Sequence, residues 1–217
     1  MDKFQIFEWI LRIPIVLLSL TIHEVAHGYA AYKLGDPTAK NFGRLSLNPL
    51  KHLDPIGALC MLVFRFGWAK PVPINTRYFK KPKRDMAISA LAGPLSNLII
   101  AFVTFVASMY VIRFGYNGLY FASNSWYIAF LFFSTFFQLN ITLAVFNLIP
   151  IPPLDGSRIL LILLPDKAYF GIMKYERYIY MGLLALLFFG LLDRPLYGVI
   201  NLFTSLFEFI TSFLPFL

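Results

Sequence analysis

Long apolar stretches alternate along the chain with short segments that carry most of its charge. A helix needs about 20 mostly apolar residues to cross a bilayer. Four stretches approach that length, at about 7–34, at 86–112, at 126–149, and as a pair of runs at 178–192 and 196–217. Asp193-Arg194-Pro195 divides the last stretch into two helices joined by a tight turn. We therefore expect an all-α polytopic membrane protein with about five transmembrane helices.

The segment between the first two spans is too short and too polar to be another ordinary span. Residues 55–69 are apolar except for Arg65, and their length predicts a re-entrant or interfacial segment. Residues 43–49 and 67–75 are short extended stretches bounded by Gly, Pro and Asn, and they predict one or two edge strands at the membrane surface. We expect a re-entrant or short β segment here.

Prolines break the chain after the third span. Three of them, at positions 150, 152 and 153, precede Asp155, and Pro165 follows the short apolar run 159–164. Irregular backbone at membrane depth is tolerated only where protein or a water-filled cavity surrounds it. The pattern predicts a proline-broken span near Asp155 followed by a short half-helix.

The chain shows no internal repeat and no low-complexity segment. We expect one intramembrane domain over residues 1–217, with a core at about 7–165 and a C-terminal helical pair at about 178–217. Composition supports the membrane interpretation, because 59% of the residues are hydrophobic, 14% are charged and the mean hydropathy is +0.69. Its one cysteine, Cys60, excludes an intramolecular disulfide and leaves the redox compartment open.

Basic residues are concentrated between the first two spans. Of the 19 Lys and Arg residues, 11 lie in residues 33–84 and four in 158–177, whereas 113–125 contains one. Positive charge is retained on the cytoplasmic side, so the loops 33–84 and 158–177 should be cytoplasmic. The net charge of +8 thus fits anionic lipid headgroups better than nucleic acid, which we do not expect as a partner. A bacterial cytoplasmic membrane is the expected location.

The first span ends in His23-Glu24-Val25-Ala26-His27. Residues four apart share a helical face, so both imidazoles can bind one zinc ion, while Glu24 lies where a carboxylate can accept a proton from metal-activated water. This pattern also arises by chance in soluble proteins. Charged residue types in a membrane helix cost roughly 2.5 to 3.5 kcal/mol each, however, so three ionisable residues within five require a shared explanation. Metal catalysis supplies that explanation.

A catalytic zinc ion usually has three protein ligands, and few other residues could provide the third. His52 lies in the basic loop and is expected to be a solvated surface histidine. Asp36 and Asp54 lie beside prolines, where aspartate commonly stabilises turns. Asp155 either faces a cavity as a ligand or caps the half-helix that begins near Ser157, and local evidence favours neither role.

Three motifs together resemble those of the site-2 protease family of intramembrane zinc metalloproteases. They are the helix ending in His23-Glu24-Val25-Ala26-His27, the charge-free span with Gly93-Pro94-Leu95-Ser96-Asn97, and residues 147–156, which end in Leu154-Asp155-Gly156. The resemblance covers about residues 15–165. The chain resembles a minimal member, since it begins directly with the motif helix and lacks appended soluble domains. Its substrate choice and regulation therefore cannot be taken from the family.

The resemblance implies that His23, His27 and Asp155 bind one zinc ion and that Glu24 is the catalytic base. It implies regulated proteolysis of transmembrane protein substrates within the bilayer, with a substrate strand pairing alongside an edge strand near the site. Asn147 matches a family asparagine associated with holding the substrate backbone, and Asn97 is a weaker candidate for substrate binding, since it could instead bond between helices.

Two other functions remain open from the sequence. A non-proteolytic zinc hydrolase could act on a lipid or a small amide with the same chemistry. A zinc-binding membrane protein or transporter would need the histidines but not Glu24, so the intact motif argues for an enzyme.

Overall fold

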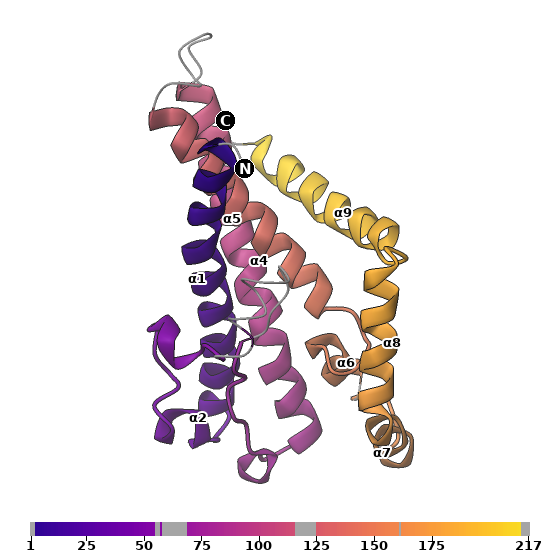
Figure 1. Cartoon of the computed structure of the whole chain (residues 1–217). Helices are drawn as coiled ribbons and strands as arrows, with labels where there is room; N and C mark the ends of the chain where they lie inside the picture. The colour runs from indigo at the N-terminus through magenta and orange to yellow at the C-terminus, as the bar shows by residue number, and fades with distance from the viewer. Residues whose placement is uncertain (1–2, 55–56, 58–68, 116–124, 161, 214–217) are drawn as a thin grey trace.

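The computed structural model of the chain describes residues 3–54, 57, 69–115, 125–160 and 162–213. The described part is helical and contains no strand, which confirms the expected all-α class (Figure 1). Its helices are α1 (Lys3–Lys33), α2 (Thr38–Asn41), η1 (Pro49–Lys51), η2 (Thr76–Tyr78), α4 (Pro82–Gly115), α5 (Ser125–Asn147), α6 (Asp155–Leu160), α7 (Asp166–Lys174), α8 (Glu176–Phe188) and α9 (Asp193–Thr211).

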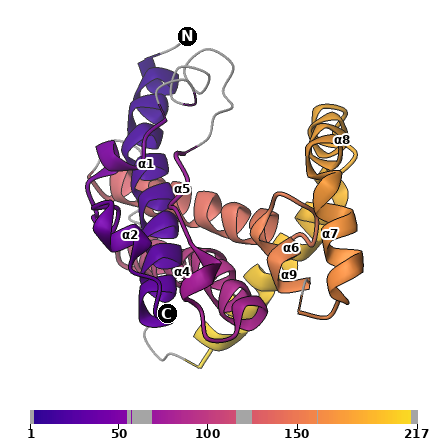
Figure 2. The same cartoon turned by 90° about the horizontal axis from the view of Figure 1, so that it is seen from below.

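Three long helices, α1, α4 and α5, run side by side and form what we call the bundle (Figures 1 and 2). Each is long and apolar enough to cross a membrane, over Trp9–Lys33, Pro82–Gly115 and Ser125–Asn147. Small residues line the buried face of α4, among them Ala87, Ala90, Gly93 and Ala101. Small side chains let helix backbones approach closely, and helix association in lipid depends on such packing.

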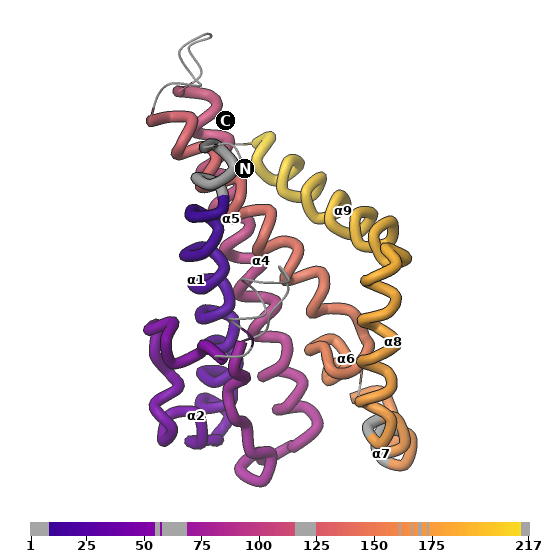
Figure 3. Tube along the Cα trace, in the orientation of Figure 1, coloured from indigo at the N-terminus to yellow at the C-terminus, as the bar shows by residue number. Residues whose placement is uncertain are grey.

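Helices α8 and α9 form a second unit, which we call the C-terminal arm (Figure 3). They meet at an angle of 84°, with α9 packed against α5 and α8 held away from the bundle (Figures 1 and 2). At 13 residues, α8 is about 20 Å long, less than the roughly 30 Å of a bilayer core. The described helices therefore include three candidate spans, or four if the bent pair counts as one, and the expected five are not confirmed.

The break between the arm helices lies slightly earlier than predicted. The turn occupies residues 189–192 and uses a positive φ of 67° at Gly190, whereas Asp193 begins α9. Pro195 is accepted inside α9 because the first helical turn needs no backbone donor there.

The loop between α1 and α4 contains no strand in its described residues. An isolated antiparallel bridge joins Leu53 and Ala69, and Pro49 begins a 3-10 turn. Pro71 and Pro73 have no N–H to donate to a ladder, which explains why residues 69–75 form no strand. The predicted edge strands are thus not confirmed, and the predicted re-entrant segment 55–69 lies almost entirely outside the described residues.

The proline-broken span is confirmed, although the half-helix begins earlier than expected. Helix α5 ends at Asn147, the chain turns through residues 148–154, and α6 begins at Asp155 rather than near Ser157 or Ile159. A side chain at Gly156 would collide with the turn after α5, since its Cβ would lie 2.6 Å from the Ile149 carbonyl oxygen. Gly156 therefore allows α6 to lie close to the turn that follows α5, with α6 packed against α4 and Asp155 half-buried.

Candidate metal centre

Two histidines on one face of α1 form the base of the centre. His23 and His27 are buried, with exposed fractions of 6% and 7%. Their Nε2 atoms lie 3.0 Å apart, as the four-residue spacing predicts for side chains on adjacent helical turns.

Helix α4 orients both rings. Residues spaced four apart on one of its faces lie against the two histidines. The Nδ1 atom of His27 donates to the Ser89 carbonyl oxygen at 2.8 Å, and Nδ1 of His23 donates to Asn97 Oδ1 at 2.5 Å. The Asn97 amide nitrogen donates to Asn140, so the Asn97 oxygen faces His23, and the His23 Nδ1 atom must carry the proton. With the proton on Nδ1, each Nε2 presents a lone pair to a metal ion.

Gly93 lies between Ser89 and Asn97 on the same face and allows α4 to approach the rings. A Cβ at this position would lie 2.7 Å from His23 Cε1 and closer still to the His27 ring. Any larger residue would push the histidines or the helix away. Pro94, which follows, lacks an N–H and frees a helical carbonyl next to the site.

A buried chain of hydrogen bonds fixes Asn97 in turn. Asn97 Nδ2 donates to Asn140 Oδ1 at 2.7 Å, and Asn140 Nδ2 donates to Ser19 Oγ at 2.9 Å and to Phe136 O at 2.8 Å. Ser19, Asn97 and Asn140 are fully buried on α1, α4 and α5. Sequence reasoning did not identify Asn140 or Ser19. The available signal was an asparagine inside a charge-free span, where a polar residue needs a partner.

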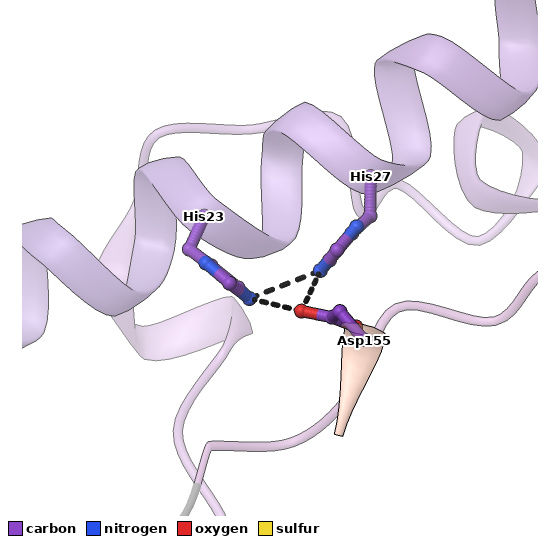
Figure 4. A group of neighbouring side chains, drawn as sticks. All are labelled: His23, His27 and Asp155. Carbon is purple, nitrogen blue, oxygen red and sulfur yellow. Dashed lines mark hydrogen bonds and ion pairs between the residues drawn. The ribbon is translucent and has the colours of Figure 1, made fainter. Parts of the chain in front are cut away.

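Asp155 completes the cluster from the N-terminus of α6 (Figure 4). Its Oδ2 lies 3.1 Å from His23 Nε2 and 3.2 Å from His27 Nε2, and this buried oxygen accepts no hydrogen bond from the described residues. Asp155 does begin α6, but no capping hydrogen bond from its side chain is present in the described part of the chain. The geometry thus favours the ligand role over the capping role.

The three atoms suit a zinc ion. Ligand atoms 2.0–2.2 Å from a tetrahedral zinc lie about 3.3–3.6 Å apart, and the separations here are 3.0, 3.1 and 3.2 Å. An outward movement of a few tenths of an ångström would admit the ion. Among the described residues, His23, His27 and Asp155 are the one group of three potential ligands that converge in this way.

Glu24 lies beside the cluster but points to a different neighbour. Its Oε2 accepts a hydrogen bond from the backbone N–H of Val72 at 2.8 Å, and its side chain is half-buried. No described residue donates to the other carboxylate oxygen, Oε1.

The remaining candidate residues lie outside the cluster. Asn147, at the end of α5, donates to Leu143 O of its own helix at 3.0 Å. Asp36 accepts from the backbone of Thr38 and Asn75 and stabilises a turn as expected. Asp54 accepts from the Gly57 N–H.

The expectation of a solvated His52 was wrong. This residue is 2% exposed, its Nε2 donates to Ser46 O at 2.8 Å, and its carbonyl accepts from the Lys70 N–H. It lies in the loop between α1 and α4 and does not join the metal cluster.

Known proteins match this chain over most of its length. Residues 116–190 match the model of peptidase family M50. "Putative zinc metalloprotease YwhC" of Bacillus subtilis is 42% identical over 204 residues, covering 93% of this chain and 92% of that protein. "Zinc metalloprotease MJ0392" of Methanocaldococcus jannaschii is 30% identical over 93% of this chain and 48% of its own length. "Putative zinc metalloprotease Rip2" of Mycolicibacterium smegmatis is 34% identical over 64% of this chain and 52% of its own length. No solved structure matches.

Proposed function

This chain belongs to peptidase family M50, the site-2 protease family of intramembrane zinc metalloproteases, and from that premise we propose which of its residues perform the chemistry. His23, His27 and Asp155 hold one zinc ion, and Glu24 is the catalytic base. The observation that carries this assignment is the convergence of three ligand atoms from α1 and α6 within 3.2 Å of one another.

The tautomers of the two histidines support metal binding. Ser89 and Asn97 accept the Nδ1 protons and turn both Nε2 lone pairs toward Asp155 Oδ2. When bound, zinc supplies a Lewis acid that polarises the substrate carbonyl and acidifies water. Removing these acceptors would leave the rings free to rotate or to exchange tautomers.

Glu24 moves protons in the proposed reaction. With Oε2 bonded to the Val72 N–H, Oε1 is the oxygen placed to accept a proton from attacking water. The same oxygen then returns that proton to the amine of the departing chain. A glutamine at position 24 can hold the same shape but cannot accept the proton.

The substrate is a membrane-embedded protein whose scissile segment unwinds before it is cut. A helix keeps its carbonyls hydrogen-bonded and sterically shielded, so an intact span exposes no peptide bond to attack. We propose that the enzyme prefers segments with helix-breaking residues.

Sidedness follows from the loop charges. Residues 33–84 and 158–177 hold 15 of the 19 basic residues (11 plus four), and we propose that both loops face the cytoplasm. His27 then lies six residues, about 9 Å along α1, from the cytoplasmic end of the helix at Lys33. Water could reach the centre from that side.

The two asparagines serve different purposes in this proposal. Asn97 is fully buried and bonded to His23 and Asn140, so it orients the metal ligand instead of contacting substrate. Asn147 is half-buried at the end of α5 and can bind a substrate backbone after releasing Leu143 O.

The test compares wild-type protein with Glu24→Gln on two tagged transmembrane substrates. One carries a helix-breaking Asn-Pro pair and the other is a continuous poly-leucine helix. We expect wild type to cut the first substrate faster, and Glu24→Gln to lose on the order of 10²–10⁴-fold in rate while retaining zinc. Cleavage by Glu24→Gln at the wild-type rate would contradict the assignment of the base, and equal cutting of both substrates would contradict the unwinding requirement.

A further inference from the structure

Residues 70–75 pass beside α1 at the level of Glu24. Their sequence places Val72 between Pro71 and Pro73, neither of which has a backbone N–H. Val72 therefore provides the one backbone donor of this tripeptide, and that donor bonds to Glu24 Oε2 at 2.8 Å. The flanking prolines also keep the chain extended here and limit its freedom to turn away.

Buried polar groups hold this segment at both ends. At the first end, the Lys70 N–H donates to His52 O at 2.8 Å, and Arg44 Nη2 donates to Lys70 O at 2.6 Å. At the other end, the Asn75 N–H donates to Asp36 Oδ2 at 2.7 Å. Burying charged groups is costly unless they are well bonded, yet Arg44 is 8% exposed and Asp36 is fully buried. The side chains of both residues form hydrogen bonds with the backbone of residues 70–75.

Val72 also packs tightly against α1. Its side chain is buried, and a Cβ at Gly28 would lie 2.9 Å from Val72 Cγ1. Gly28 adjoins His27, so the segment touches α1 on the same turn that carries the metal ligand and the base. The Val72 amide is therefore fixed relative to the centre before any substrate arrives.

We propose that the backbone N–H of Val72 is a positioning donor for Glu24. A glutamate side chain rotates freely unless it is held, and the misplacement of a catalytic group by 1 Å can be costly in rate. A charge-assisted hydrogen bond to Oε2 selects one orientation of the carboxylate and leaves Oε1 directed to the proton it accepts. This inference rests on the proposed role of Glu24 as base and adds the element that aims it.

The test removes the backbone donor at position 72 and leaves the Glu24 side chain unchanged. Val72→Pro deletes the N–H and keeps an extended, proline-rich segment, whereas Val72→Ala keeps the N–H and shortens the side chain. We expect Val72→Pro to lower kcat on the order of 10- to 100-fold, the effect of a lost hydrogen bond to a charged group. Its KM should stay within about twofold and its zinc content should match wild type. Val72→Ala keeps the N–H and loses part of the packing, so it should lower kcat several-fold less than Val72→Pro does.

Two outcomes would overturn the proposal. One is a wild-type kcat in Val72→Pro, and the other is an equal fall in Val72→Ala, which would assign the effect to packing. Arg44→Met provides a second route if Val72→Pro does not fold, since methionine has no N–H to donate to the Lys70 carbonyl and Val72 is left unchanged. We expect a several-fold lower kcat with unchanged KM and zinc content, and an unchanged kcat would also overturn the proposal. Full activity in Glu24→Gln would instead overturn the proposed function itself.

Discussion

The bundle and the C-terminal arm differ in where they place polar and apolar side chains. In the bundle, Ser19, Asn97 and Asn140 are completely buried and bonded to one another. In the arm, Phe188 is 86% exposed and Leu202 is 69% exposed. Lipid tails are as apolar as leucine, so exposure of such side chains costs little in a membrane.

In a membrane protein, polar contacts mark functional regions better than apolar burial does. Apolar burial does not distinguish the two regions well, because lipid can replace protein as a neighbour. Buried polar side chains that bond from one helix to another do distinguish them, since each needs a partner at membrane depth and buried Thr211 of α9 bonds within its own helix. In the bundle those partners form a path from Ser19 through Asn140 and Asn97 to His23, and so they orient one ring of the candidate metal centre.

The largest effect should come from removing a metal ligand. We expect His27→Ala to lose zinc and to lower cleavage on the order of 10³-fold or more, because Lewis-acid stabilisation is worth several kcal/mol and about 1.4 kcal/mol is tenfold in rate. His52→Ala is the matched control, a buried histidine outside the cluster, and it should keep its zinc. Zinc content and cleavage rate are measured together. Zinc retention and cleavage in His27→Ala would remove that residue from the centre.

The next largest effect should come from adding one methyl group beside the histidines. Gly93→Ala would force a Cβ against both rings, and we expect the loss of zinc affinity to be on the order of 10- to 100-fold. Gly198→Ala in α9 adds the same atom where no neighbour lies within 4 Å, and its affinity should equal wild type. Competition with a zinc chelator measures both. Equal affinities would show that α4 does not confine the rings.

A smaller effect should follow from breaking the polar path. We expect Asn140→Leu to lower the free energy of unfolding by about 1–2 kcal/mol, because Asn97 and Ser19 lose a partner in a membrane interior. Asn201→Leu on the exposed face of α9 is the matched change and should alter it by less than about 0.5 kcal/mol. Unfolding in mixed micelles measures the difference. Similar values for both variants would erase the contrast between bundle and arm.

The smallest effect should come from the arm surface. Phe188→Ala removes a side chain that is 86% exposed, and we expect cleavage and unfolding to stay at wild-type values. The cleavage rate and the free energy of unfolding in mixed micelles are measured for this variant and for wild type. A clear fall in cleavage with normal unfolding would give α8 a role in substrate entry that the bundle alone does not explain.

Much of the fold could be predicted from the lengths of the apolar stretches in the sequence. The three long spans agree with their predicted positions within a few residues. Their bounds can be predicted because a helix that crosses the bilayer must be apolar over the thickness of the hydrocarbon core. The number of spans at the C-terminus could not be predicted in this way, because α8 is apolar but short and the chain bends after it, at Gly190. Length and composition do not report such a bend.

Only part of the candidate metal centre could be predicted from the sequence. His23 and His27 share a helix, so their spacing was sufficient to predict a pair of ligands. Asp155 was locally indistinguishable from a helix cap, and only its position relative to α1 separates the two roles. The Asn140 and Val72 contacts join residues 43 and 48 positions apart, and no local pattern encodes them.

The most direct test of the account is zinc-edge X-ray absorption on the purified wild-type protein and on Glu24→Gln. The account predicts one zinc with two imidazole nitrogens and at least one carboxylate oxygen at about 2.0–2.2 Å, the same in both proteins. A sulfur neighbour at about 2.3 Å would require Cys60 and would contradict the ligand set. A coordination shell that changes in Glu24→Gln would show that Glu24 binds the metal instead of acting as its base.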